Sequence, residues 1–251
     1  MRRMGRPGRP SLQITHRIKK KKGLHRMVYI TGDTHRHFDR IEEMIWYFEE
    51  NDVIVILGDV GINYSGFPED YELKKDLSEL PVVLFCVHGN HEMRPENLSS
   101  YEQEEFYGGE AYYEPEFPNL IFAKCGEIYD LGGKRCMVIG GANSVDKAKR
   151  TPGVDWWDDE QPSEEIKYRV EKRLKDEGWR VDVVLSHTCP AKCFKRLYSF
   201  GYTGEKHDIS TEKWLDSIED RLDYDAWCCG HFHTDENIDK VHFFHHGLDE
   251  L

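Results

Sequence analysis

Short apolar runs alternate with segments in which apolar residues recur at helical spacing. In the first half of the chain the apolar runs are 28–31, 52–57 and 82–87, and amphipathic segments at 39–50 and 68–80 separate them. Each run is nearly continuous in β-branched and other apolar residues, which is typical of strands buried on both faces. This half is therefore predicted to form parallel strands covered by helices.

The second half shows a related pattern. Runs at 120–123, 128–131 and 135–139 lie close together with Gly-rich turns, so they are predicted to be antiparallel strands of a second sheet. Helices are then predicted at 163–177 and 211–222, and strands at 181–186, 226–229 and around 241–244. No element is predicted for the acidic segment 95–107. Residues 27–251 contain no visible repeat or linker and are interpreted as one domain.

Charge divides the chain at residue 26. Residues 1–26 hold ten of the 34 Lys and Arg residues and none of the 47 Asp and Glu residues, although the net charge is −13. This basic tail is predicted to be disordered, or to be an upstream extension of the reading frame, because Met27 directly precedes the first strand. Alternatively, the tail binds nucleic acid phosphates, with weaker binding at higher salt. The acidic body works against that interpretation.

Composition restricts the location of the protein. No apolar run approaches the ~20 residues of a membrane-spanning helix, and the mean hydropathy is −0.70. No membrane association is therefore predicted. The seven Cys residues are odd in number and scattered, mostly in or beside apolar runs. This usage is typical of reduced thiols, so a cytoplasmic location is predicted. At 39% hydrophobic residues, 251 residues suffice for one substantial core.

Residues able to bind metal ions follow five of the predicted strands. The sequences after these strands contain Asp33-Thr-His35, Gly58-Asp59, Gly89-Asn90-His91-Glu92, His187 and Gly230-His231-Phe232-His233. In open α/β sheets the loops at the carboxyl ends of the strands converge, although they are distant in sequence. Carboxylate, amide and imidazole groups in one crevice suit divalent transition metals. A turn or cap explains any one loop, but five such coincidences are not a satisfactory explanation.

These blocks, in this order, resemble the signature of the calcineurin-like metallophosphoesterases, in particular the small bacterial and phage enzymes of that family. The family pattern reads D-x-H, G-D, G-N-H-[ED], a single His and G-H-x-H, and no block is missing here. The resemblance implies an α/β fold, a four-layer αββα sandwich of two mixed β-sheets flanked by helices. It also implies a hydrolase that acts on phosphate ester bonds.

The resemblance further implies a role for each residue of the blocks. Two divalent ions (Mn, Fe or Zn) would be bound, and Asp59 would bridge them because two close dications need shared negative charge. A metal-bridged hydroxide would attack the phosphorus of a phosphomonoester or phosphodiester. His91 would face the substrate and protonate the leaving oxygen, or else only orient neighbouring groups. The remaining ligands would be Asp33, His35 and His233 for the first ion, and Asn90, His187 and His231 for the second.

Contacts to the substrate are less well defined by the sequence. The segment 140–150, GGANSVDKAKR, follows a predicted strand, and its Lys147 or Arg150 is a candidate to bind a phosphate. Ordinary salt bridges within a surface loop are the alternative. Arg94, two residues after Glu92, is a third candidate.

Two alternative functions stay open. A protein Ser/Thr phosphatase is disfavoured because the family pattern there has Asp-Arg-Gly at the bridging aspartate, whereas this chain reads Asp59-Val-Gly. The second alternative is a non-catalytic protein. It would bind nucleic acid through its tail and keep the metals as a structural element. Structural metal sites exhaust their ligand positions, whereas seven protein ligands shared by two ions leave positions open. The sequence does not predict the oligomeric state.

Overall fold

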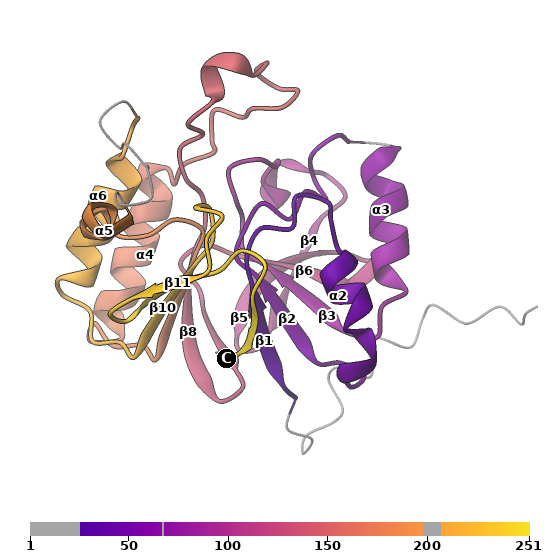
Figure 1. The fold of residues 1–251 in the computed structure, drawn as a ribbon, viewed down its shortest axis with the longest axis horizontal. Coiled ribbons are helices and arrows are strands. Elements are labelled where there is room, and N and C mark those ends of the chain that lie inside the picture. Colours follow the sequence, from indigo (N-terminus) through magenta and orange to yellow (C-terminus); the bar gives the residue numbers. More distant parts are fainter. Residues whose placement is uncertain (1–25, 67, 198–206) are drawn as a thin grey trace, which may run out of the picture.

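The computed structural model describes residues 26–66, 68–197 and 207–251 (Figure 1). The predicted basic tail, apart from Arg26, lies outside the described residues. Two mixed β-sheets pack face to face, and helices cover their outer faces, which confirms the predicted four-layer αββα sandwich.

The first sheet has seven strands in the order β13-β1-β2-β3-β6-β5-β4. Strands β1, β2, β3 and β6 run parallel, whereas β13, β5 and β4 add antiparallel edges. The strand bounds are β1 Val28–Thr31, β2 Val53–Ile56, β3 Val83–Cys86, β4 Glu102–Phe106, β5 Gly109–Glu114, β6 Phe117–Ala123 and β13 Leu248–Glu250.

The second sheet has six strands in the order β11-β12-β10-β9-β8-β7. Its central strands β8, β9, β10 and β12 are parallel, and β7 and β11 form the antiparallel edges. The strand bounds are β7 Ile128–Leu131, β8 Lys134–Ile139, β9 Val183–Ser186, β10 Ala226–Cys229, β11 Glu236–Ile238 and β12 Val241–Phe243.

Helices form the two outer layers. Helices α2 and α3 cover the first sheet, and α4, α5 and α6 cover the second (Figure 1). Ser163 caps α4 by accepting the backbone N–H of Ile166, and the helix buries one side through Ile166, Val170 and Leu174. The bounds are α2 Asp39–Glu43, α3 Glu69–Ser78, α4 Glu164–Asp176, α5 Phe194–Leu197 and α6 Ser210–Glu219. Short 3₁₀ turns lie at η1 Ile45–Tyr47, η2 Pro95–Asn97, η3 Lys147–Lys149 and η4 Ala191–Cys193.

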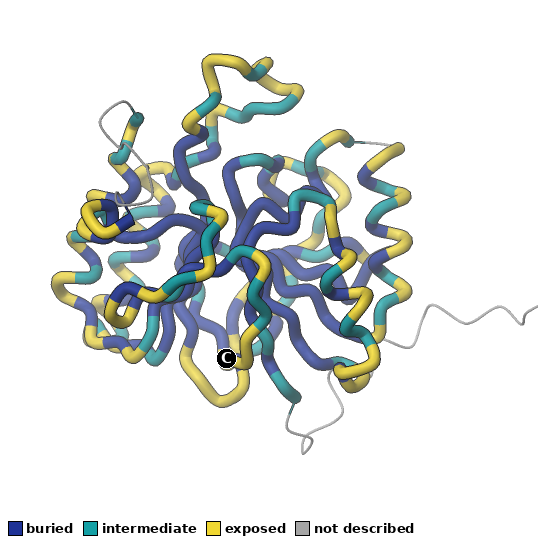
Figure 2. Tube along the Cα trace, in the orientation of Figure 1, coloured by how far each residue is buried: buried dark blue, intermediate teal, exposed yellow. Residues whose placement is uncertain are grey.

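Alternation along the strands fills three apolar layers. In β2, Val53 and Val55 face the core between the sheets, whereas Ile54 and Ile56 face the layer beneath α2 and α3. The second sheet behaves in the same way, with Trp227 and Cys229 of β10 turned towards α4 and α6. Figure 2 shows the resulting buried interior along the strands, with exposed residues on the outer helices and loops. Burial on both faces accounts for the continuous apolar runs of the sequence.

The structure corrects the prediction for residues 120–123. This segment belongs to β6, which lies in the first sheet parallel to β3 and not in the second sheet as an antiparallel strand. The sequence also did not predict the hairpin β4–β5, which begins in the acidic segment and forms the edge of the first sheet. Because β4, with the sequence EQEEF, is exposed over most of its length, it carries no apolar pattern.

The helix predicted at 39–50 is also shorter than expected. Helix α2 ends at Glu43, and the 3₁₀ turn η1 follows it. Ile41 and Phe48 are buried, but Trp46 and Tyr47 between them are 71% and 60% exposed. The apolar spacing in 39–50 therefore reflects two buried side chains, Ile41 near the start and Phe48 near the end, and not one continuous helix.

Two further observations concern membrane spans and the cysteines. In the part of the chain that the structure describes, no helix is both long enough and apolar enough to cross a membrane. All seven Cys residues are buried, and none forms a disulfide bond.

Candidate metal centre and cleft

The candidate ligands lie in loops that follow β1, β2, β3, β9 and β10 at the carboxyl ends of these strands. Asp33 and Asp59 are 2% and 1% exposed, and the side chain of His187 is fully buried. Close approach of the loops requires glycine before the ligands. A methyl group on Gly89 would lie 2.1 Å from Asp59 Oδ1, and one on Gly230 would lie 2.3 Å from Asp33 Oδ1.

Each aspartate uses its two oxygens differently. Asp59 Oδ1 accepts the backbone N–H groups of Asn90 and His91 at 2.8 Å each, and Asp33 Oδ1 accepts that of His231 at 2.9 Å. These bonds fix both carboxylates against loops of other strands. The Oδ2 atoms are thereby left to face the imidazoles, and Asp33 Oδ2 is buried without a hydrogen-bond partner.

One group of ligand atoms surrounds Asp33 Oδ2. His233 Nε2 lies 3.3 Å from it and His35 Nε2 lies 3.6 Å from it, while the two imidazole nitrogens are 3.0 Å apart. All three ligand atoms lie within 4.8 Å of one another. The spacing of this group suits a single metal ion, because each atom offers a lone pair.

A second group lies on the other side of Asp59. His187 Nε2 is 3.6 Å from Asp59 Oδ2 and 2.8 Å from Asn90 Oδ1. The other nitrogen, Nδ1, lies 2.7 Å from the carbonyl oxygen of Leu57, and Asn90 Nδ2 donates to Ser144 Oγ. Donation from His187 Nδ1 leaves Nε2 as an acceptor that faces a second acceptor, Asn90 Oδ1. Two converging acceptors require a proton or a cation between them. The ring of His231 lies 5.0 Å from that of His187.

The electrostatics of the cluster also require positive charge. Burial raises the pKa of Asp59, but the imidazoles of His187, His91 and His35 outweigh it and hold that pKa well below its usual range. Burial lowers the pKa of His187, whereas Asp59 raises it, to about 9 overall. Burial lowers the pKa of His231 to about 3, so this imidazole is neutral. Two buried carboxylates need compensating positive charge, which protonated His187 supplies here and which divalent cations would supply in its place.

Backbone strain is concentrated in the same loops. Among the residues described, nine that are not glycine have positive φ, and four of these are candidate ligands: His35 at 44°, Asp59 at 47°, His231 at 69° and His233 at 49°. Such conformations cost on the order of 1 kcal/mol or more each and cluster at functional sites. The strain is therefore consistent with selection for ligand placement rather than for stability.

The cluster opens into a cleft of about 600 Å³. His91 lines this cleft, and its Nε2 atom lies 4.0 Å from Asp59 Oδ2. Arg150 also lines this cleft, where it donates to Asp146 Oδ1 at 2.7 Å and to the carbonyl oxygen of Asp155 at 3.1 Å. A guanidinium group beside metal ligands can bind an anion that would also contact the metals.

The other two predicted substrate contacts lie elsewhere. Lys147 is exposed, and its Nζ atom donates to Asn143 Oδ1 without lining the cleft. Arg94 is 4% exposed, donates to the carbonyl oxygen of Asp159 and lines a separate pocket. The structure therefore brings the predicted metal ligands, His91 and Arg150 together but leaves Lys147 and Arg94 outside.

Sequence reasoning overlooked the groups that support the ligand loops. Glu92 is 1% exposed and accepts backbone N–H groups of Val60, Gly61 and Gly89, so it joins the loops after β2 and β3. Ser144 orients Asn90. The signal for Glu92 was its place in the G-N-H-[ED] block, whereas nothing in the sequence identified Arg36, which also lines the cleft.

Replacing Gly89 by Ala is expected to lower both the metal content and the stability of the protein, because it displaces Asp59. The added methyl would lie 2.1 Å from both the backbone nitrogen and Oδ1 of Asp59. Overpacking of this kind costs about 1–3 kcal/mol, and displacement of a reactive group by ~1 Å can cost ~10²-fold in rate. Thermal unfolding and metal content would be measured. Gly133→Ala is the control: no atom lies within 4 Å of the added methyl, but φ at this exposed turn is +82°, so backbone strain should lower its melting temperature while its metal content stays unchanged.

Comparison with known proteins agrees with this geometry. The model of one family, described as calcineurin-like phosphoesterase, matches residues 27–235, which include every candidate ligand. A search of curated proteins gave no match.

Proposed function

The chain belongs to the calcineurin-like phosphoesterase family, and from this premise we propose that it hydrolyses phosphate monoesters or diesters with two divalent metal ions. The observation that carries the proposal is the position of Asp59 Oδ2, 3.8 Å from His35 Nε2 on one side and 3.6 Å from His187 Nε2 on the other. One buried oxygen between two groups of ligand atoms is the arrangement that a bridging carboxylate needs.

The proposed ligands follow from these two groups. Asp33, His35 and His233 would hold one ion, Asn90, His187 and His231 would hold the other, and Asp59 would belong to both. The donor set of imidazoles, carboxylates and one amide suits Mn, Fe or Zn. When bound, such ions would supply hydroxide from water near neutral pH and Lewis acidity towards phosphoryl oxygens.

The remaining chemistry falls to side chains that line the cleft. His91 is placed to donate a proton to the leaving oxygen, a contribution of ~10²–10⁴-fold for a positioned acid. Arg150 is placed to bind the phosphoryl oxygens that do not react and to stabilise their charge in the transition state. Asp33 and Asp59 keep the centre anionic enough to hold the ions, because backbone N–H groups fix their Oδ1 atoms and leave Oδ2 free.

Neither alternative has equal support. A protein Ser/Thr phosphatase would need a cation next to the bridging aspartate, but Val60 is buried there, and the side chain of Arg94 is turned to Asp159. A purely structural metal centre would not need a cleft of about 600 Å³ in front of its ligands. Hydrolysis of 4-nitrophenyl phosphate and bis(4-nitrophenyl) phosphate with added Mn²⁺ tests the proposal. Absence of hydrolysis of both compounds by the metal-loaded protein contradicts it.

Arg150→Ala is expected to weaken binding of the substrate without loss of metal. A charge-assisted hydrogen bond contributes about 1.5–3 kcal/mol, so KM for a phosphomonoester should rise about tenfold or more. Lys147→Ala is the matched control, because it removes an equal charge from the same loop but outside the cleft. Equal effects of the two substitutions would mean that Arg150 acts only through the general electrostatic field.

A further inference from the structure

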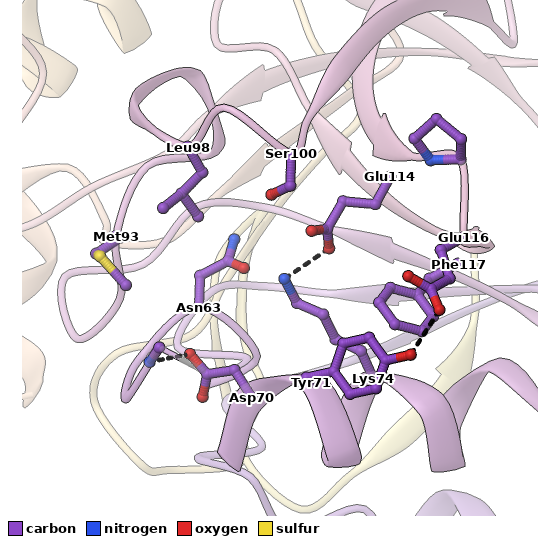
Figure 3. Close-up of a pocket in the computed structure, with 12 residues that line it drawn as sticks. Asn63, Asp70, Tyr71, Lys74, Met93, Leu98, Ser100, Glu114, Glu116 and Phe117 are labelled. Atoms are coloured by element: carbon purple, nitrogen blue, oxygen red, sulfur yellow. Dashed lines mark hydrogen bonds and ion pairs between the residues drawn. The ribbon is translucent and has the colours of Figure 1, made fainter. Parts of the chain in front are cut away.

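A second hollow of about 440 Å³ lies beside the metal cleft, between the start of α3 and the β4–β5 side of the first sheet (Figure 3). Apolar walls come from Tyr71, Met93, Leu98 and Phe117. Phe117 is buried, whereas Ser100 at the mouth is exposed. A small hollow with mostly apolar walls and a few polar groups is typical of a small-molecule site.

The segment after Asp59 separates this hollow from the cleft. Gly61 and Tyr64 line the cleft, while Asn63 lines the hollow. Arg36, which lines the cleft, donates to Asp70, which lines the hollow, at 2.5 Å. On the side of the hollow, the backbone N–H of Met93 donates to the carbonyl oxygen of Asn63 at 2.8 Å. The hollow is thus a separate site that shares a wall with the cleft.

Asn63 presents an unused hydrogen-bond donor to the hollow. The residue is 1% exposed, and its Oδ1 atom accepts the hydroxyl of Tyr101 at 3.0 Å. Its Nδ2 atom is buried and has no partner among the described residues. In Figure 3 the amide points towards the space between Leu98, Ser100 and Glu114. An unmade hydrogen bond at a buried amide costs about 1–3 kcal/mol, which a ligand acceptor would recover.

Charges at the hollow disfavour an anionic ligand. Lys74, 6% exposed, pairs with Glu114 at 2.6 Å, and Tyr71 donates to Glu116 at 2.6 Å (Figure 3). The lining also contains Asp70, which is paired with Arg36. After these two ion pairs only Glu116 is left uncompensated, so the hollow has a small negative charge that disfavours a phosphate group. The carboxylates can accept N–H groups instead. The site therefore favours an uncharged ligand that carries both an acceptor and a donor.

We propose that this hollow binds an uncharged planar heterocycle with a ring carbonyl next to a ring N–H, as in guanine or uracil. The carbonyl oxygen accepts from Asn63 Nδ2, the ring N–H donates to the carboxylate of Glu114, and the ring face packs on the apolar walls. Such a ring offers a flat apolar surface with polar atoms only at its edge, which matches the lining. The site is independent of the proposed hydrolysis, because binding needs neither metal nor turnover.

Titration calorimetry of the full chain with guanosine, uridine and adenosine tests the proposal. Guanosine and uridine should bind with a dissociation constant below about 1 mM. Adenosine, which lacks the carbonyl beside an N–H, should bind about tenfold more weakly. Inorganic phosphate should not displace either nucleoside, because it would occupy the metal cleft. Failure of both nucleosides to bind, displacement by phosphate, or equal binding of adenosine overturns the assignment.

Two variants locate the site. Ser100→Tyr places a ring at the exposed mouth and should weaken guanosine binding at least about tenfold, whereas Ser99→Tyr, at the exposed neighbour outside the lining, should not. Asn63→Asp replaces the unused donor by an acceptor and should weaken binding by about the same factor. Unchanged binding in Ser100→Tyr overturns the proposal even if Asn63→Asp fails to fold.

Discussion

Replacing Asp59 by Asn is expected to abolish metal-dependent phosphoester hydrolysis while leaving the fold intact. The amide oxygen can still accept the two backbone N–H groups that Oδ1 accepts now, so the loops after β2 and β3 stay in place. The amide nitrogen would then face the imidazoles of His35 and His187 in place of Oδ2. A donor at this position cannot bridge two ions. A loss of about 4 kcal/mol in transition-state stabilisation corresponds to ~10³-fold in rate.

The measurement is kcat/KM for 4-nitrophenyl phosphate and its diester analogue with Mn²⁺, together with the bound metal per chain after dialysis. Asp176→Asn, an exposed helical residue paired only with Lys172 in the described structure, is the control for loss of one negative charge. A chain that starts at Met27 should keep full activity. Retained hydrolysis in Asp59→Asn would contradict the bridging role. Tail-dependent binding of nucleic acid without hydrolysis would favour the non-catalytic alternative.

Replacing His91 by Asn is expected to lower kcat for an alkyl phosphate by ~10²–10⁴-fold without loss of bound metal. His91 lines the cleft but is not one of the proposed ligands, and its backbone N–H, which holds Asp59 Oδ1, is kept in the variant. If His91 protonates the leaving oxygen, the loss should depend on the leaving group. It should be small for 4-nitrophenolate, which leaves without a proton, and large for an alkyl phosphate.

Comparison of an aryl and an alkyl phosphate in the wild type and in His91→Asn measures this dependence. His37→Asn, at an exposed position in the loop between β1 and α2, is the control and should leave both rates unchanged. Equal losses for the two substrates would indicate that His91 orients its neighbours and does not transfer the proton.

Some of the fold could be predicted, because a strand that is buried on both faces needs apolar residues at every position. The strands β1, β2 and β3 are continuous apolar runs, and their alternate residues face two different cores. The edge strand β4 could not be predicted, because an exposed strand needs no apolar residues and only pairs through its backbone with β5. The sequence also could not assign β6 to a sheet, because the apolar residues of β6 fit either sheet equally well.

The candidate site shows the same division. The sequence identified which residues gather, because Asp33, Asp59, Asn90 and the imidazoles each follow a strand, and parallel strands present their carboxyl ends at one edge. It did not identify their supports. Glu92 holds three backbone N–H groups from two loops, a function that depends on distances between segments distant in sequence.

By itself the sequence determined the buried parallel strands and the helices between them, the family and the residue types that converge, because each of these depends on local pattern and spacing. The tertiary structure alone decided which side chains reach the cleft. Arg150 and Lys147 are three residues apart in one loop, yet only Arg150 lines the cleft, and Arg94 lines another pocket. The physical reason is that the direction of a side chain in an irregular loop is set by the partners it meets, here Asp146 for Arg150, Asn143 for Lys147 and Asp159 for Arg94.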